Sequence, residues 1–156
     1  MKKRYILISM IFLILTTGCE YKEETIKNEY IAIKNQTFNE ENYQNEDIPV
    51  EIVTTIERID EEAINYEVEI KNPKESMHNV KAMVVHNYYN EDVFPSIGVF
   101  DEPKELLSNT EGTSKLVLKD TIKTTKNLSK LDLVLKIRIE YINDNKEKKD
   151  IYYKTT

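Results

Sequence analysis

The residues that could carry out chemistry in this chain are few, and their spacing favours neither catalysis nor metal binding. His78 and His86 are the only histidines. Eight residues along one continuous strand would separate them by about 26 Å, too far for both to ligate one ion. A bend at Asn79 would shorten this separation, but no cysteine or carboxylate spacing completes a zinc site. His86, between Val85 and Asn87 on an expected inner strand, is interpreted as a structural residue whose hydrogen bonds are satisfied.

No motif for nucleophilic or phosphate chemistry is present either. Ser76 lies two residues from His78, but a catalytic triad is assembled across a fold rather than between sequence neighbours. There is no Gly-x-Ser-x-Gly turn, no glycine-rich phosphate loop, and no glycine or terminal glutamate around Asp144 to complete a calcium loop. Acidic pairs lie in polar stretches typical of a solvated surface, at Glu23-Glu24, Glu40-Glu41 and Glu61-Glu62. We therefore predict a protein that is not an enzyme and that binds no metal.

The first 19 residues carry the strongest signal in the sequence. Lys2, Lys3 and Arg4 precede an apolar run over 5–15, which is shorter than the span of about 20 residues that a bilayer-crossing helix needs. A positive start, a short apolar run and a small residue are typical of a secretory signal. The run ends in Leu15-Thr16-Thr17-Gly18-Cys19, which resembles the lipobox of bacterial lipoproteins.

This resemblance implies a lipid-anchored protein. In bacterial lipoproteins the cysteine thiol receives a diacylglycerol and a peptidase cuts just before it, which here implies removal of 1–18 and lipidation of Cys19. Two acyl chains suffice for stable anchoring, because each buried CH₂ contributes about 0.8 kcal/mol. The expected location is the extracytoplasmic face of the cell membrane, with that lipid as the covalent group and no other cofactor. A plain secretory signal with an incidental cysteine and an uncleaved N-terminal membrane helix stay open as alternatives.

Charge and cysteine content narrow the classes of partner. The 156-residue chain has a formal charge of −6, and loss of the three basic residues of 1–18, which hold no acids, makes the remainder −9. A chain this acidic has no electrostatic reason to bind nucleic acid or an anionic membrane face, so we expect basic or neutral partners. Cys19 is the only cysteine, and its lipidation would leave no disulfide and no reactive thiol.

Composition divides the chain behind the signal into two parts. Residues 19–47 are polar, with isolated apolar positions, which predicts a flexible tether with a reach of about 30 Å. The alternative is that Tyr30–Ile33 adds an edge strand. Residues 48–156 alternate between apolar and polar positions and are punctuated by turn signals, which predicts one β domain that begins near Pro49.

About seven strands are expected in this domain. Clear alternation runs over 64–70, and an apolar run over 80–89 predicts a central strand covered on both faces. The segment 93–100 is expected to be an edge strand or irregular, 101–108 to form one or two helical turns, and 143–146 to turn a terminal hairpin. The other expected strands are 50–57, 116–122, 131–141 and 151–153, and the strongest alternation points Leu131, Leu133, Leu135, Ile137, Ile139 and Tyr141 inward. An all-β, immunoglobulin-like two-sheet antiparallel sandwich fits this pattern, with an open oligosaccharide-binding barrel as the alternative.

A second resemblance covers roughly residues 64–94. The segments Val68-Glu-Ile-Lys-Asn-Pro73, Asn79-Val-Lys-Ala-Met-Val-Val85 and Tyr88-Tyr89-Asn90 are similar to the strand–asparagine–strand–aromatic-turn pattern of FxLYD-like sandwich domains on bacterial surface lipoproteins. The Leu-Tyr-Asp triplet of that group and the turn glycine after it are missing. The resemblance implies a sandwich fold and an extracellular role, and it implies no activity.

Two adjacent tyrosine pairs lie on expected strands. Neighbours on a strand face opposite sides, so one member of each pair should point outward. Because exposed tyrosine suits contact with protein or sugar, Tyr88, Tyr89, Tyr152 and Tyr153 form the candidate interaction surface. The alternative is that the outer tyrosines only cover a strand face.

Together these features predict a non-catalytic interaction module that holds a protein or another envelope partner at the membrane surface. The alternative from a different class is a small-ligand receptor or enzyme, with a pocket near Tyr89, Phe94 and Phe100 at one loop end of the sandwich. A third alternative is a purely structural protein of the envelope, which the sequence does not distinguish from an interaction module.

Overall fold

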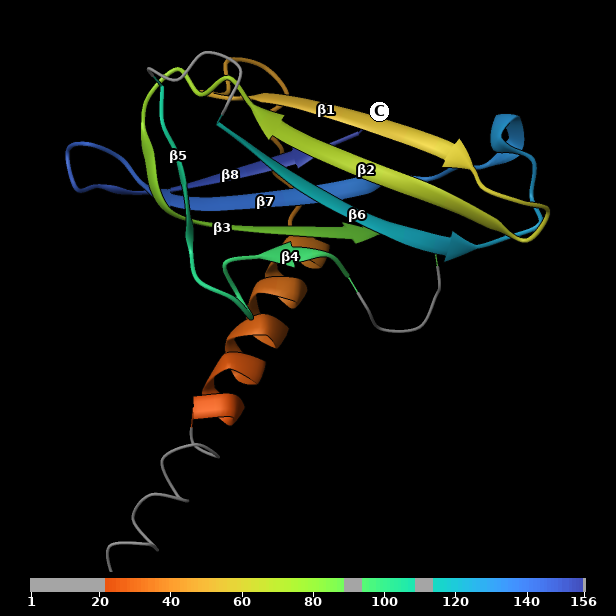
Figure 1. The fold of residues 1–156 in the computed structure, drawn as a ribbon, viewed down its shortest axis with the longest axis horizontal. Coiled ribbons are helices and arrows are strands. Elements are labelled where there is room, and N and C mark those ends of the chain that lie inside the picture. The colour runs from red at the N-terminus through yellow and green to blue at the C-terminus, as the bar shows by residue number, and fades with distance from the viewer. Residues whose placement is uncertain (1–21, 89–93, 109–113, 156) are drawn as a thin grey trace, which may run out of the picture.

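Two antiparallel sheets packed face to face form the body of the protein (Figure 1). The computed structural model describes residues 22–88, 94–108 and 114–155. A three-stranded sheet has the order β1-β2-β6, and a five-stranded sheet has the order β4-β3-β7-β8, with β5 also paired to β3. The strands are β1 (Glu51–Arg58), β2 (Ala63–Lys71), β3 (Met77–His86), β4 (Ser96–Ile97), β5 (Lys104–Leu106), β6 (Lys115–Lys123), β7 (Leu135–Ile142) and β8 (Lys148–Lys154), with a 3₁₀ turn at Leu128–Lys130.

This architecture confirms the expected all-β, two-sheet antiparallel sandwich. One apolar core lies between the sheets and receives side chains from both, such as Val68 of β2 and Ile137 of β7, neither of which has exposed surface. The barrel alternative is wrong, because the described strands form two separate sheets.

Strand β2 shows why alternation of apolar and polar residues in the sequence predicts a sheet with one buried face. Its inward residues have no exposed surface: Ile64, Tyr66, Val68 and Ile70. The outward Glu69 lies between Lys115 and Lys71, at 2.6 and 2.8 Å. Hydrogen bonds from Lys115 and then Lys71 lower the pKa of Glu69 to about 2. Alternation therefore gives β2 one core face and one charged solvent face.

Strand β3 is central and covered on both faces, as expected. It pairs with β7 on one side and with β4 and β5 on the other. Its inward residues join the main core and its outward ones a second apolar cluster: Val80, Ala82 and Val84 in the first, Met83 and Val85 in the second. A bend does occur at Asn79, which has a φ of 52° and lies where the pairing of β3 with both β5 and β7 shifts register. This bulge turns His78 and Lys81 to the same outer face.

Strand β7 begins at Leu135, four residues later than the alternation predicts. Residues 131–134 lie outside the strand ladder and are held by the side-chain amide of Asn87. Its oxygen accepts from the backbone N–H of Val134, and its nitrogen donates to the carbonyl of Asp132, both at 2.8 Å. The terminal hairpin is confirmed, because β7 pairs with β8. Its turn is held by the side chain of Asn143, which is buried and accepts two backbone N–H bonds.

The expected helical turns over 101–108 are wrong. Strand β5 runs through this segment and pairs with β3, and Leu106 is fully buried. The extended conformation is favoured because it satisfies backbone groups along the edge of β3 that a helical turn would leave unpaired. The preceding segment contributes only the two-residue edge strand β4, which agrees with the expected short or irregular element.

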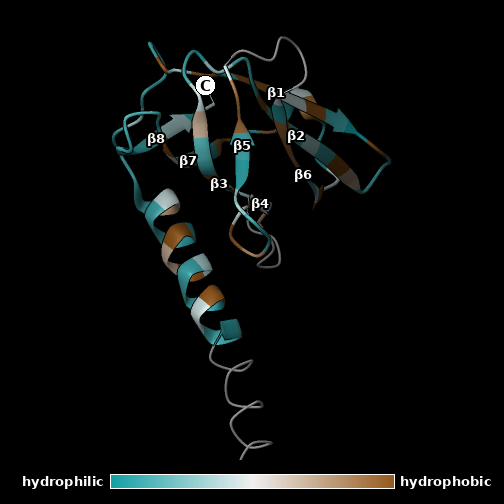
Figure 2. Ribbon diagram, turned by 60° about the vertical axis from the view of Figure 1, so that its left-hand side comes forward, coloured by the Kyte–Doolittle hydropathy of each residue, from teal (hydrophilic) through white to brown (hydrophobic). Residues whose placement is uncertain are grey.

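Residues 22–39 form a helix, which differs from the flexible tether expected over 19–47. Tyr30–Ile33 lies within this helix and is not an edge strand. One side of the helix is half-buried or buried, at Ile26, Tyr30, Ile33 and Thr37. This i, i+4, i+7, i+11 spacing is that of one helix face. The helix leaves the sandwich on the side opposite β1, and Figure 2 shows apolar positions interrupting its polar surface.

Candidate functional site

The outer face of the five-stranded sheet, on which the helix is packed, is the candidate functional site; we call it the docking face. Its residues are the outward members of the two central strands: Lys81, Met83 and Val85 of β3, and Lys136, Arg138 and Glu140 of β7. Alternation places them outward because their neighbours Ala82 and Ile139 face the main core.

An apolar contact holds the middle of the helix on this face. Ile33 is 8% exposed and packs with Met83, Val85 and Val99, and Tyr30 lies at the margin of the same cluster. Full burial of such a side chain contributes about 1.5–3 kcal/mol. The helix is therefore a packed part of the fold and not a loose connection.

Arg138 lies at the centre of the polar half of the docking face. Its side chain is 8% exposed and contacts Asp150 at 2.7 Å and Glu140 at 3.1 Å. It also donates to the side-chain oxygen of Gln36 on the helix at 2.7 Å, and the ring of Tyr152 lies 5.5 Å from the guanidinium. Because a buried cation needs such partners, Arg138 couples the rotation of the helix to the register of β7 and β8.

Lys136 binds the C-terminal end of the helix. Its ammonium donates to the carbonyl oxygen of Phe38 at 2.5 Å and to that of Glu40 at 3.5 Å. The last carbonyls of a helix lack intrahelical partners and carry partial negative charge, so a lysine here stabilises the helix end. The docking face thus recognises the helix by its apolar side, its polar side and its terminus.

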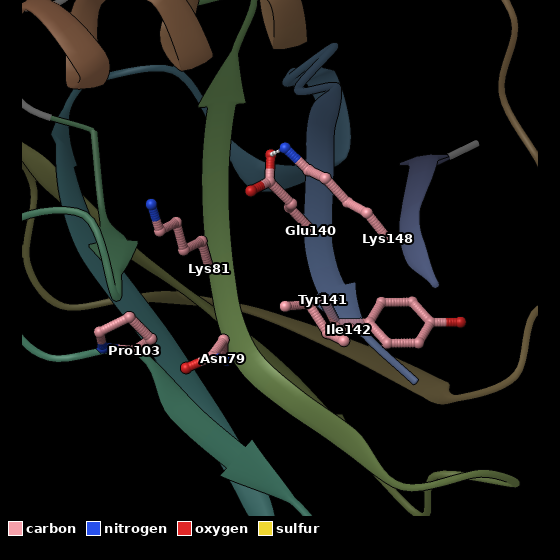
Figure 3. A pocket seen from close by; sticks show the side chains of 7 residues that line it. All are labelled: Asn79, Lys81, Pro103, Glu140, Tyr141, Ile142 and Lys148. Atoms are coloured by element: carbon pink, nitrogen blue, oxygen red, sulfur yellow. Dashed lines mark ion pairs between the residues drawn. The ribbon is translucent and has the colours of Figure 1, made fainter. Parts of the chain in front are cut away.

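A hollow of about 410 Å³ lies beside the helix on the same face (Figure 3). Lys81 and Asn79 line it from β3, Lys148 lines it from β8, and Pro103 closes one side. Its charges have partners already, because Lys81 pairs with Glu29 of the helix and Lys148 pairs with Glu140 at 2.9 Å. A charged ligand would have to break these pairs, so the arrangement is suited to holding the helix rather than to acid–base chemistry.

Ile33→Asp is expected to release the helix from the docking face while the sandwich stays folded. A carboxylate between Met83 and Val85 loses the apolar contact and is costly to bury. Amide hydrogen exchange should become about tenfold faster or more along 22–39 and stay slow in β3 and β7. Ile31→Asp is the matched control, since Ile31 is 43% exposed; equal exchange in both variants would contradict the docked helix.

His78 bridges three segments at the edge of the docking face. Its Nδ1 contacts a carboxylate oxygen of Glu105 in β5, and its Nε2 lies 3.0 Å from Oδ1 of Asp144 in the β7–β8 turn. The two carboxylates lie on opposite ring nitrogens, so they do not converge on one metal position. The hydroxyl of Ser76 lies 3.2 Å from that of Ser108, and the ring nitrogens of His78 contact carboxylates instead. The bridge is therefore a structural clip.

This clip should make folding stability depend on pH. Hydrogen bonds to Asp144 and then to Glu105 raise the pKa of His78 above its ordinary value. A raised folded-state pKa stabilises the fold fully below the unfolded pKa of about 6.5, and this stabilisation is lost as pH rises through the folded pKa. In urea unfolding, the stability gap between the unmodified protein and His78→Gln should be larger at pH 6 than at pH 9. An equal gap at both values would contradict the clip.

The tyrosines of the candidate interaction surface lie in separate places. Tyr152 and Tyr153 face opposite sides of β8, as expected: Tyr152 lies over Arg138, whereas Tyr153 packs against the main core. Tyr88 also packs against the main core, and its hydroxyl lies 2.8 Å from that of Thr124. All three are half-buried, and Tyr89 lies outside the described residues. Their binding of a partner stays a prediction.

The second histidine is buried inside the fold, but the expectation that its hydrogen bonds are satisfied is wrong, because its Nδ1 has no hydrogen-bond partner among the described residues. His86 is 5% exposed and lies edge-on between the rings of Tyr66 and Phe94, at 5.8 and 5.1 Å. Burial lowers the pKa of His86, so the neutral form is favoured. Phe94 lies against this ring, and the ring centroids of Phe100 and Tyr30 are 4.5 Å apart; Tyr89, the third aromatic of the expected ligand pocket, lies outside the described residues, so that pocket stays a prediction.

The predicted signal and the predicted lipidation site both lie at the N-terminus. Cys19 and the signal 1–18 lie outside the described residues. Within the described ranges, no helix combines the length and the apolar character required to cross a membrane. Across the same ranges, no three histidine, cysteine or acidic side chains are grouped so as to hold a metal ion.

Sequence reasoning missed Arg138, Lys136 and Lys81 as contacts of the helix. A signal for the docking face was present, because the expected burial of both faces of β3 required something to cover Met83 and Val85. The spacing of Ile26, Tyr30, Ile33 and Thr37 was a second signal, because it is that of one helix face. It was hard to recognise because the last of these residues is a polar threonine. No family model matches the chain, and no curated protein matches it.

Proposed function

We propose that the protein is an extracytoplasmic lipoprotein, held at the cell membrane by a diacylglycerol on Cys19, whose sandwich is a non-catalytic interaction module. The lipobox-like run that ends at Cys19 supports the anchor. The single observation that carries the proposal is that a docked helix is already present at residue 22, three positions after that cysteine.

The helix determines how the proposed anchor would be connected to the sandwich. At about 1.5 Å per residue, the 18 residues from 22 to 39 extend for about 27 Å. Because Ile33, Arg138 and Lys136 fix this rod on the docking face, residues 22–39 would join the anchored N-terminus to the sandwich as a docked helix rather than as a flexible tether. The side bearing β1, opposite the projecting helix, would then point away from the membrane (Figure 1).

A non-catalytic role agrees with the chemistry of the described side chains. The ring nitrogens of His78 are both occupied by carboxylates, and His86 is buried between aromatic rings. The lysines of the hollow are paired with Glu29 and Glu140. A module of this kind presents a surface and performs no reaction.

Mass spectrometry of the protein isolated from its own cell envelope tests the proposal. The expected result is an N-terminus at Cys19 that carries a diacylglycerol, with 1–18 removed. An unmodified thiol at Cys19 would overturn the anchor.

A further inference from the structure

We propose that strand β1 is a docking edge that pairs with an extended, basic segment of a partner protein. The observation behind this proposal is a regular sheet edge, unpaired among the described residues, with acidic residues at both of its ends. The proposal names the partner of the interaction module and rests on that function for its place at the cell surface. The binding of a peptide by β1 depends only on residues of the sandwich and not on the lipid anchor.

The free edge of β1 differs from the edges formed by β8 and β6. All eight residues of β1 pair with β2 in unbroken register, and the described backbone pairs of β1 go to β2 alone. The edge of β8 is covered, because Gln44 donates its backbone N–H to the carbonyl of Tyr152 at 2.8 Å. Strand β6, the other edge of the small sheet, carries Lys115, Lys119 and Lys123, and lysine is a residue that protects edges.

Strand β1 lacks three of the usual protections against strand addition. It holds no lysine, proline or bulge, and its central residues are Val53, Thr54 and Thr55. β-Branched residues favour an extended backbone, and an exposed regular edge offers unpaired N–H and C=O groups to another chain. A peptide that adds as a strand would form main-chain hydrogen bonds along this edge.

Charge determines which kind of segment fits. Residues 46–62 contain seven acidic residues against one arginine, a formal charge of −6. All seven are exposed: Glu46, Asp47, Glu51, Glu57, Asp60, Glu61 and Glu62. The arginine, Arg58, is engaged with backbone carbonyls, including those of Asp60 at 2.9 Å and Thr124 at 3.2 Å. A basic segment is attracted to this edge and an acidic one is repelled.

Apolar contacts are available at the far end of the same edge. Ile56 is 37% exposed and Ile59 is 52% exposed, although both are large aliphatic side chains. Arg58, the sequence neighbour of Ile59, lines a hollow of about 350 Å³ together with Glu61 and Leu128, among others. An aliphatic side chain of the partner could cover the two isoleucines or enter this hollow, so the best segment alternates basic and aliphatic residues.

The edge also faces the direction that a partner would approach. Strand β1 lies on the side of the sandwich opposite the projecting helix in Figure 1, and the two remain apart in Figure 2. A helix that leads to a membrane anchor would therefore leave β1 free of the bilayer.

Three synthetic octapeptides, titrated in detergent against the protein isolated from its own cell envelope, test the proposal. Alternating Lys-Val should bind, and alternating Glu-Val should bind at least about tenfold more weakly because its charge is repelled. Alternating Lys-Pro keeps the four charges but loses every second N–H donor, so it should also bind at least about tenfold more weakly. Equal binding of Lys-Pro and Lys-Val would show a purely electrostatic contact and overturn strand addition.

A pair of variants locates the contact. Glu57→Lys with Glu61→Lys should weaken Lys-Val binding about tenfold or more. Glu23→Lys with Glu24→Lys, on exposed residues of the helix, makes the same change in net charge and should leave binding unchanged. Equal weakening by both pairs would place the attraction in overall charge and contradict a site at β1.

Amide hydrogen exchange and light scattering identify the occupant. Lys-Val should slow exchange at β1 and leave β8 unchanged. A protein whose β1 is protected without peptide, and whose mass rises with concentration, would have a second copy on this edge, which would overturn the proposal. If the protein isolated from its own envelope carries an unmodified Cys19 and still binds Lys-Val, the anchor is refuted and the docking edge stands.

Discussion

Leu135→Asp is expected to unfold the sandwich. Leu135 begins β7 opposite His86 and has no exposed surface. Truncation of a buried leucine alone costs about 2–5 kcal/mol, and aspartate adds the cost of a carboxylate in an apolar core. A domain has about 5–15 kcal/mol of stability in total, so this change removes most of it. Circular dichroism should show no cooperative thermal transition.

The matched control for this variant is Leu128→Asp. Leu128 lies in the 3₁₀ turn and is 37% exposed, so the same chemical change occurs outside the core. Its melting temperature should remain close to that of the unmodified protein, because most surface substitutions change stability by less than about 0.5 kcal/mol. A cooperative, native-like melt of Leu135→Asp would contradict the inward assignment of this residue.

Cys19→Ala is expected to release the protein from the membrane fraction. The proposed diacylglycerol supplies two acyl chains, and without the thiol no lipid can be attached. The described residues contain no bilayer-crossing helix that could replace it. Cell fractionation followed by detergent partitioning should move the variant from the membrane and detergent phases to the aqueous phase.

Ile33→Asp serves as the control for that experiment. It disrupts the docked helix but leaves the lipobox-like run intact, so the variant should stay with the membrane. Membrane association that persists in Cys19→Ala would mean that the N-terminal segment is an uncleaved membrane helix. An uncleaved helix is one of the two alternatives to lipidation that the sequence leaves open.

The helix shows where sequence reasoning reached its limit. Burial of Met83 and Val85 on the outer side of β3 was expected because 80–89 is apolar on both faces, yet the segment that covers them was interpreted as a tether. A short amphipathic helix gains little stability from its own propensities and forms because a surface receives its apolar side. The partner surface comes from strands about 50 and 100 residues away, so no local pattern reveals it.

The ion network on the docking face is a second case. Arg138 looks like the polar, outward member of an alternating strand, and its near-complete burial follows only from Gln36, Asp150 and Tyr152 closing over it. His78 likewise gains its two carboxylates from β5 and from a turn 66 residues away. These groups meet because the sheet order places β5, β3 and β7 side by side.

The sequence alone determined which residues of β2 and β7 enter the sandwich core. Alternation at Ile64–Ile70 and Leu135–Tyr141 is a local property, since a strand turns successive side chains to opposite faces. Only the tertiary structure decided what covers the outer sheet, which edge stays open and which charges become neighbours. Those outcomes depend on strand order and on long-range contacts, where the free energy of burial is gained between segments that are distant in the chain.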